Sequence, residues 1–142
     1  MKDKYHDLLP EPSFYPLLVT AIADGDIGID LQGYESALII VSAGGIADGS
    51  GAVTLYTFEV SECDTLAGAY TAVATKDLVG TEPSFEAITG ATHEENESKA
   101  VGYIGTKRYI RVDLVAVPST PGAGGTFSGV VVKGNPRHAP AV

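Results

Sequence analysis

Short apolar runs rich in β-branched and aromatic residues alternate with turn-forming residues along most of the chain. Asp48-Gly49 and Pro121-Gly122 are examples of the turns, in which glycine and proline interrupt the apolar pattern. Runs of this kind, with turn signals at a spacing of roughly 8–12 residues, are typical of β-sandwiches and small barrels. The pattern predicts about eight short strands, over residues 17–23, 36–43, 52–60, 69–74, 84–88, 99–104, 108–117 and 126–133.

Two of these strands carry a pattern that indicates their place in a sheet. Residues 36–43 are almost continuously apolar, which favours a strand buried on both faces. In residues 108–117, apolar side chains such as Ile110 and Val112 alternate with polar ones such as Arg111, as in a strand with one buried face. No segment has the 3.6-residue period of a helix. We therefore predict an all-β fold, an antiparallel β-sandwich of jelly-roll type.

The chain has the size of one domain, because 142 residues lie within the usual range of roughly 100–200. Pro10 and Pro12 lie among charged residues near the N-terminus, and proline fixes an extended backbone that lacks an N–H donor. We predict an extended N-terminal arm over residues 1–15, a β-sandwich domain over 16–133 and a C-terminal tail over 134–142. Such extended termini either fray or lie across a neighbouring subunit.

The chain is acidic, with 18 acidic and 9 basic residues and a net charge of −9. This balance argues against a nucleic-acid partner, since phosphates are bound by basic surfaces. The charge is also unevenly distributed: residues 24–97 hold 14 acids and one base, whereas residues 98–142 hold six bases and one acid. Either the folded molecule has two oppositely charged surfaces that guide docking, or the two regions pack together and their charges partly cancel.

The sequence predicts neither a membrane segment nor export. No apolar run reaches the roughly 20 residues that span a bilayer, and the N-terminal residues lack the apolar core of a signal peptide. Cys63 is the only cysteine, so no internal disulfide can form, and a reducing compartment is the simplest assumption. We therefore expect a protein that is made in the cytoplasm and does not bind membranes.

One acidic turn has some resemblance to a calcium loop. Asp24, Asp26 and Asp30 follow part of the ligand spacing of such a loop, but Ile29 stands where the loop needs glycine. A hairpin turn with solvated carboxylates is the stronger interpretation, and the possibility of a Ca²⁺ site stays open.

The remaining candidates for chemistry are weak. His6, His93 and His138 lie in three separate polar segments, which is not the spacing of a zinc site. Cys63 has an acidic residue on each side, and negative charge opposes formation of the reactive thiolate. We expect no catalytic residues, no cofactor and no metal, and therefore not an enzyme.

A basic and aromatic cluster begins at Lys107. If this segment is a strand, Lys107, Tyr109 and Arg111 share one face, and tyrosine and arginine are favoured in protein interfaces. The alternative is an ordinary solvated strand face.

Three strings together resemble a family of small virion proteins of tailed phages: residues 31–37 (LQGYESA), 101–112 (VGYIGTKRYIRV) and 134–140 (GNPRHAP). The cement, or decoration, proteins of short-tailed phages with icosahedral heads are the most similar in our view. The resemblance implies a jelly roll that sits on the outer capsid surface as a homo-oligomer, as a dimer rather than a trimer, with the major capsid protein as its partner. From the basic cluster and these strings we expect interface residues at Tyr34, Lys107, Tyr109, Arg111, Arg137 and His138.

The expected function is therefore that of a structural virion protein on the capsid exterior, made in the bacterial host cytoplasm, which cements contacts between major capsid protein subunits. Two alternatives remain. One is a sugar-binding β module for host attachment, which would use tyrosine rings because the chain has no tryptophan. The other is a head–tail or tail accessory protein.

Overall fold

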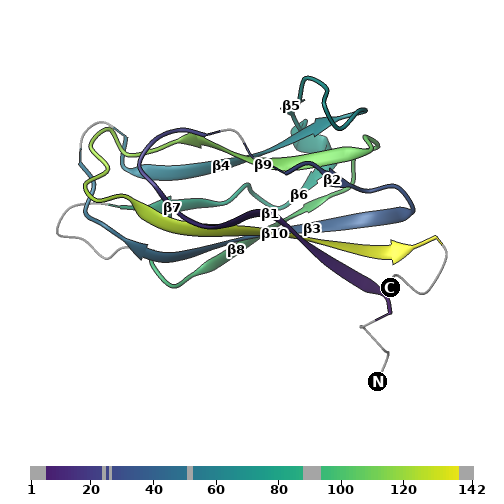
Figure 1. The fold of residues 1–142 in the computed structure, drawn as a ribbon, viewed down its shortest axis with the longest axis horizontal. Coiled ribbons are helices and arrows are strands. Elements are labelled where there is room, and N and C mark those ends of the chain that lie inside the picture. The colour runs from purple at the N-terminus through teal and green to yellow at the C-terminus, as the bar shows by residue number, and fades with distance from the viewer. Residues whose placement is uncertain (1–5, 24, 26, 51–52, 88–93, 138–142) are drawn as a thin grey trace.

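A computed structural model of the chain describes residues 6–23, 25, 27–50, 53–87 and 94–137, and Figure 1 shows its two layers of strands. One layer, sheet A, has the order β1 (Leu8–Val19), β10 (Gly125–Pro136), β3 (Tyr34–Ile46), β8 (Ser98–Tyr103) and β6 (Leu78–Val79). The other layer, sheet B, has the order β2 (Ile29–Asp30), β9 (Tyr109–Ala116), β4 (Leu55–Cys63) and β5 (Thr71–Ala72), and β7 (Ser84–Glu86) also pairs with β4. A 3₁₀ turn covers Thr75–Asp77. The predicted all-β sandwich is confirmed.

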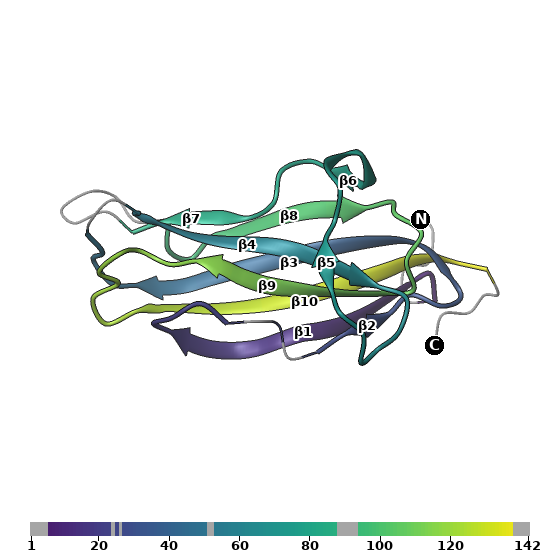
Figure 2. The ribbon, with the colours of Figure 1, turned by 90° about the horizontal axis from the view of Figure 1, so that it is seen from above.

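The strand order is that of a jelly roll. β1 pairs with β10, β2 with β9, β3 with β8, and β4 with β5 and β7, so the two halves of the chain run antiparallel like one long hairpin. This hairpin is then rolled up, which brings β10 beside β3 and β9 beside β4. Apart from β4 and β5, which both lie in sheet B, consecutive strands lie in different layers. Figure 2 shows the strands of both layers from above. The two-residue strands β2 and β6 were missed because a run of two residues has no readable period.

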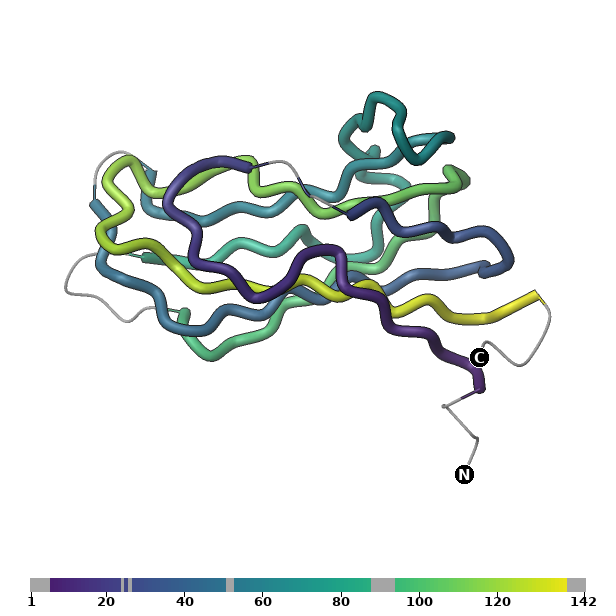
Figure 3. The backbone as a smooth tube through the Cα atoms, in the orientation of Figure 1, coloured from purple at the N-terminus to yellow at the C-terminus, as the bar shows by residue number. Residues whose placement is uncertain are grey.

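The N-terminal boundary predicted at residue 15 falls inside strand β1, because this strand already begins at Leu8. Prolines are accepted here because β1 is an edge strand, where the missing N–H of Pro10 or Pro12 need not face a partner strand. At the other end of the chain, β10 continues to Pro136, past the boundary predicted at residue 133. Leu8 lies opposite Gly134, so the two segments run side by side in sheet A (Figure 3).

The two sheets meet in a layer of aromatic rings. Phe127 of sheet A is 1% exposed, and its ring centroid lies 4.9 Å from that of Tyr56, 5.1 Å from that of Phe58 and 5.5 Å from that of Phe85, all from sheet B. These separations are those of favourable tilted and edge-on ring pairs. Aliphatic side chains complete the core on both sides, among them Ile39, Val41, Val60, Val101, Ile110 and Val131.

Strand β1 is fastened to this core where its register is irregular. The pairing with β10 shifts on both sides of Phe14, so that the consecutive residues Ser13 and Phe14 are both buried. The Val112 N–H of sheet B donates to Ser13 Oγ over 3.1 Å, and the Phe14 ring stacks on Phe58 with centroids 5.8 Å apart. Opposite Phe14 stands Gly129, where a Cβ atom would collide with the Phe14 ring.

We predict that Gly129→Ala destabilises the protein by about 1–3 kcal/mol, because the added methyl group displaces the Phe14 ring from the core. The free energy of unfolding is measured by urea denaturation. Gly45→Ala is the matched control: it lies in β3, and a Cβ atom there has nothing within 4 Å. Equal stabilities of the two variants would mean that residues 8–15 do not pack as β1.

Candidate functional site

A hollow of about 540 Å³ lies at one end of the sandwich. The turn between β2 and β3, the loop between β8 and β9, and the residue after β10 line it together. Its lining includes the buried Tyr103, and we call its more accessible aromatic and basic residues, Tyr34, Lys107, Arg108 and Arg137, the end surface. Two of the three strings that resemble the phage proteins, residues 31–37 and 101–112, contribute lining residues, and the third does so through Arg137.

Backbone hydrogen bonds hold these segments together. The turn before β3 depends on Gly33, whose φ of 90° is costly for other residues, and the Tyr34 N–H donates to the Leu31 carbonyl over 3.0 Å. The Arg137 N–H donates to the Gly33 carbonyl over 2.8 Å, and the Leu31 N–H donates to the Arg108 carbonyl over 2.8 Å. Backbone contacts therefore join segments that are 77 and 104 residues apart in the chain.

The exposed cations of the end surface are each beside a carboxylate. Lys107 Nζ lies 2.7 Å from Asp64 Oδ2, Arg108 donates to both carboxylate oxygens of Asp30 over 3.0 and 2.7 Å, and Arg137 lies 3.7 Å from Glu35. The hydrogen bond from Arg108 lowers the pKa of Asp30, and the same contact raises the pKa of Arg108. The pKa of Lys107 is raised by its bond to Asp64.

A buried lysine, which sequence reasoning missed, supports the end surface from inside. Lys133 has a side chain only 6% exposed, and its Nζ lies 2.6 Å from Glu11 Oε1 and donates to the Asp30 carbonyl over 3.1 Å. The same ammonium lies 4.7 Å from the centroid of the Tyr34 ring, a cation–π contact. A signal was present in the sequence, since Lys133 stands at an inward position of an otherwise apolar strand.

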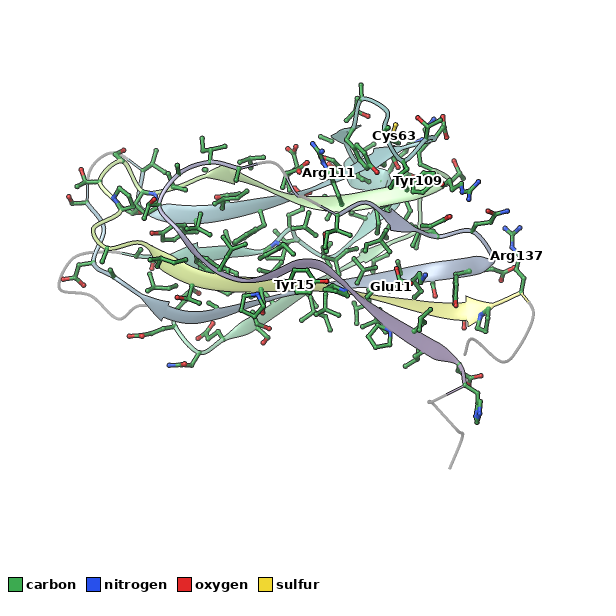
Figure 4. The ribbon with its side chains drawn as sticks, in the orientation of Figure 1. Glu11, Tyr15, Cys63, Tyr109, Arg111 and Arg137 are labelled. Atoms are coloured by element: carbon green, nitrogen blue, oxygen red, sulfur yellow. The ribbon has the colours of Figure 1, made fainter. Side chains whose placement is uncertain are left out.

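The other predicted interface residues lie elsewhere. Tyr109 and Arg111 alternate with buried residues of β9 and point to the outer face of sheet B, near Cys63 in Figure 4. Arg111 Nε lies 2.8 Å from Asp113 Oδ1, and its guanidinium stacks 4.5 Å from the centroid of the Tyr70 ring. Lys107 precedes β9 and does not share this strand face, and His138 lies outside the described residues.

The uneven charge along the sequence is largely cancelled in the fold. All six bases of residues 98–142 have a carboxylate within 4.0 Å, in the pairs Lys99–Glu94, Lys107–Asp64, Arg108–Asp30, Arg111–Asp113, Lys133–Glu11 and Arg137–Glu35. Four of these carboxylates come from the acidic stretch of residues 24–97. Of the two alternatives stated for the charge, the structure supports the packing of the two regions against each other.

Other kinds of site find no positive support in the part of the chain that the structure describes. There, no three His, Cys, Asp or Glu side chains gather as a metal site would require. Asp24 and Asp26 of the acidic turn lie outside that part, so the possible Ca²⁺ site is not tested. Within the same residues, no helix has the length and apolar character needed to cross a membrane.

Comparison with known proteins adds no relative: no family model, no curated protein and no solved structure matches this chain.

The Lys133–Glu11 pair gives a direct test of how the end surface is supported. We predict that Glu11→Ala lowers the free energy of unfolding by about 1–3 kcal/mol, because it leaves a buried ammonium without its carboxylate. Glu35→Ala is the control, since its partner Arg137 is 65% exposed and such pairs contribute less than about 1 kcal/mol. Thermal and urea unfolding measure both, and equal losses would contradict a structural role for Lys133.

The Asp30–Arg108 pair predicts a small dependence of stability on pH. Because the pKa of Asp30 is lower in the folded state, the pair stabilises the protein above the unfolded pKa of about 3.9 and loses that contribution as the pH falls through the folded value. The Arg108 and Asp30 side chains are 45% and 40% exposed, so solvent screening keeps the effect small. The free energy of unfolding should decrease less between pH 6 and pH 3 in Asp30→Asn than in the unmodified chain. The double variant Asp30→Asn with Arg108→Gln should show the same pH dependence as Asp30→Asn alone. If the free energy of unfolding of Asp30→Asn decreased between pH 6 and pH 3 as much as that of the unmodified chain, the pairing would be contradicted.

Proposed function

We propose that this protein is a structural virion protein that binds the outer surface of a phage capsid and stabilises contacts between major capsid protein subunits. In this proposal it is made in the bacterial host cytoplasm, has no catalytic role and acts together with other copies of itself. Anything that binds the assembled shell but not its separate subunits favours the shell by mass action, so an extended contact surface is sufficient for such a function.

The observation that carries the proposal is the convergence of distant segments on the end surface. The strings on which the resemblance rests are far apart in the sequence, yet residues from all three line one hollow. Tyr34, Lys107 and Arg137, three of the six expected interface residues, lie there together. The resemblance and the geometry therefore indicate the same surface.

The chemistry of the end surface suits a protein partner. Exposed ion pairs such as Lys107–Asp64 contribute little to stability because solvent screens them, so a partner can take over either charge at little cost to the fold. Tyr34 adds an aromatic ring that Lys133 supports from below. Aromatic and arginine side chains in one patch are typical of the residues that dominate binding energy in interfaces.

The sugar-binding alternative has less support from the tyrosines. Tyr34, Tyr70 and Tyr109 each have a cation within 5.0 Å of the ring centroid, from Lys133, Arg111 and Arg108. A cation over a ring occupies one of the two faces on which a sugar could stack. The location of the protein in the particle distinguishes a head–tail or tail accessory protein from a protein of the capsid exterior.

The test is binding to purified virions and empty capsids of the phage that encodes the chain. We predict that the protein co-sediments with the particles and raises the temperature at which they release DNA. Lys107→Glu and Arg137→Glu together should weaken binding at least about tenfold, the loss expected when interface anchors are removed.

Lys76→Glu is the control for charge reversal, because Lys76 is exposed in the 3₁₀ turn and does not line the hollow. It should bind like the unmodified chain. Absence of the protein from purified virions, or equal weakening by Lys76→Glu, would contradict the proposal.

A further inference from the structure

The outer face of sheet A carries no charge over its paired strands. Pro10, Val132, Leu38, Gly102 and Val79 form one row across all five strands, because each lies opposite the next in the strand register. The next row consists of Pro12, Val130, Ile40 and Ala100, and a third of Ser128, Ser42 and Ser98. We call these three rows the neutral face.

The neutral face stands out against the charge of the molecule. Four residues of the sheet A strands are charged: Glu11, Glu35, Lys99 and Lys133. All four stand at positions that share the inner face of the sheet with buried residues such as Ala37 and Val131. The outward side chains are nonetheless accessible, with Leu38 43% exposed and Val79 58% exposed. The outer face of sheet B differs, since Glu59 and Asp113 lie opposite each other there beside Arg111. The first two rows are apolar, and the largest exposed apolar patch of a protein is often a functional surface.

We propose that the neutral face pairs with the neutral face of a second copy of this chain. Two copies with a net charge of −9 repel each other, and the neutral face is where they can meet without bringing like charges together. This inference deepens the proposed function, in which several copies act together. It can be tested without capsids, so the two can fail separately.

The shapes on the two sides of β3 support a two-fold arrangement. β3 is the central strand, with Val130 and Val132 on one side and the smaller Ala100 and Gly102 on the other. Consider a two-fold axis that runs parallel to β3 in the plane between two copies placed face to face. A rotation of 180° about this axis places each valine of one copy over a small residue of the other. Leu38 then faces Leu38 of the second copy, as an isologous interface requires.

The edges of sheet A favour contact through the face rather than edge to edge. Pro10 and Pro12 lie on the edge strand β1 and cannot donate to an added strand, and the opposite edge, β6, has only two residues. At about 4.8 Å between strands and about 6.6 Å between rows, the twelve positions of the neutral face cover about 380 Å² per copy. A pair therefore buries about 760 Å², the size of a weak and transient contact, and should dissociate on dilution.

Sedimentation equilibrium of the purified chain tests this inference. We expect a reversible monomer–dimer equilibrium, with the dissociation constant raised at least about tenfold by Leu38→Asp, which places two carboxylates face to face. Val115→Asp is the matched control, because Val115 is 39% exposed on strand β9 of the other sheet, and this variant should dimerise normally. Leu38→Lys should also dissociate, and an equal mixture of Leu38→Asp and Leu38→Lys should recover the dimer.

Recovery in the mixture shows that both single variants are folded, so a loss of dimer cannot be ascribed to misfolding. A chain that stays monomeric at about 100 µM, well above the dissociation constants of specific complexes, would overturn the inference. So would a dimer that tolerates Leu38→Asp, or one that Val115→Asp disrupts equally. Loss of capsid binding in Leu38→Asp with a monomeric unmodified chain would assign the neutral face to the shell instead.

Discussion

The contact of Phe127 with three aromatic rings of the opposite sheet is the interaction on which the rest of the structure depends. Phe127 comes from β10, the strand that pairs with both β1 and β3, whereas Tyr56, Phe58 and Phe85 come from β4 and β7. The ring cluster therefore sets the spacing between the sheets. It also positions β1, since Phe14 stacks on Phe58 and so joins the edge strand to the same layer.

Packing in this layer determines where charge can lie. Lys99 and Lys133 have inward parity, and each extends from the apolar layer to a carboxylate, Glu94 or Glu11, with an aromatic ring close to its ammonium. With the charges of sheet A on its inner side and at its ends, its outer side is left neutral. The two outer faces of the sandwich therefore differ in chemistry, and a third surface, at the end of the sandwich, carries exposed ion pairs around a hollow.

Some of this could be predicted from the sequence, because β3, β8 and β9 are long enough to show a period. The predicted strand 36–43 lies inside β3. The predicted strands 99–104 and 108–117 begin and end within one residue of β8 and β9. β1 was missed over residues 8–15 because prolines indicate a loop unless the strand is known to be at an edge, and edge position is a property of the whole sheet.

The surfaces were harder to predict than the strands. Tyr34, Lys107 and Arg137 were expected interface residues. Arg108 was recognised only as a member of the basic cluster, and Lys133 was not singled out, because the importance of both comes from neighbours distant in the chain. The neutral face could not be predicted either. It depends on the register of five strands, and a shift of one residue in β1, β3, β8 or β10 would bring a charged residue outward.

The central claim is that this sandwich stabilises a capsid through the end surface while two copies meet through the neutral face. The decisive measurement is an electron cryomicroscopy reconstruction of virions from the phage that is proposed to encode the chain. We expect pairs of sandwiches on the outer surface, with Tyr34, Lys107 and Arg137 next to the shell and Leu38 of each copy facing the other. Virions without this protein, or with its end surface directed to solvent, would contradict the account.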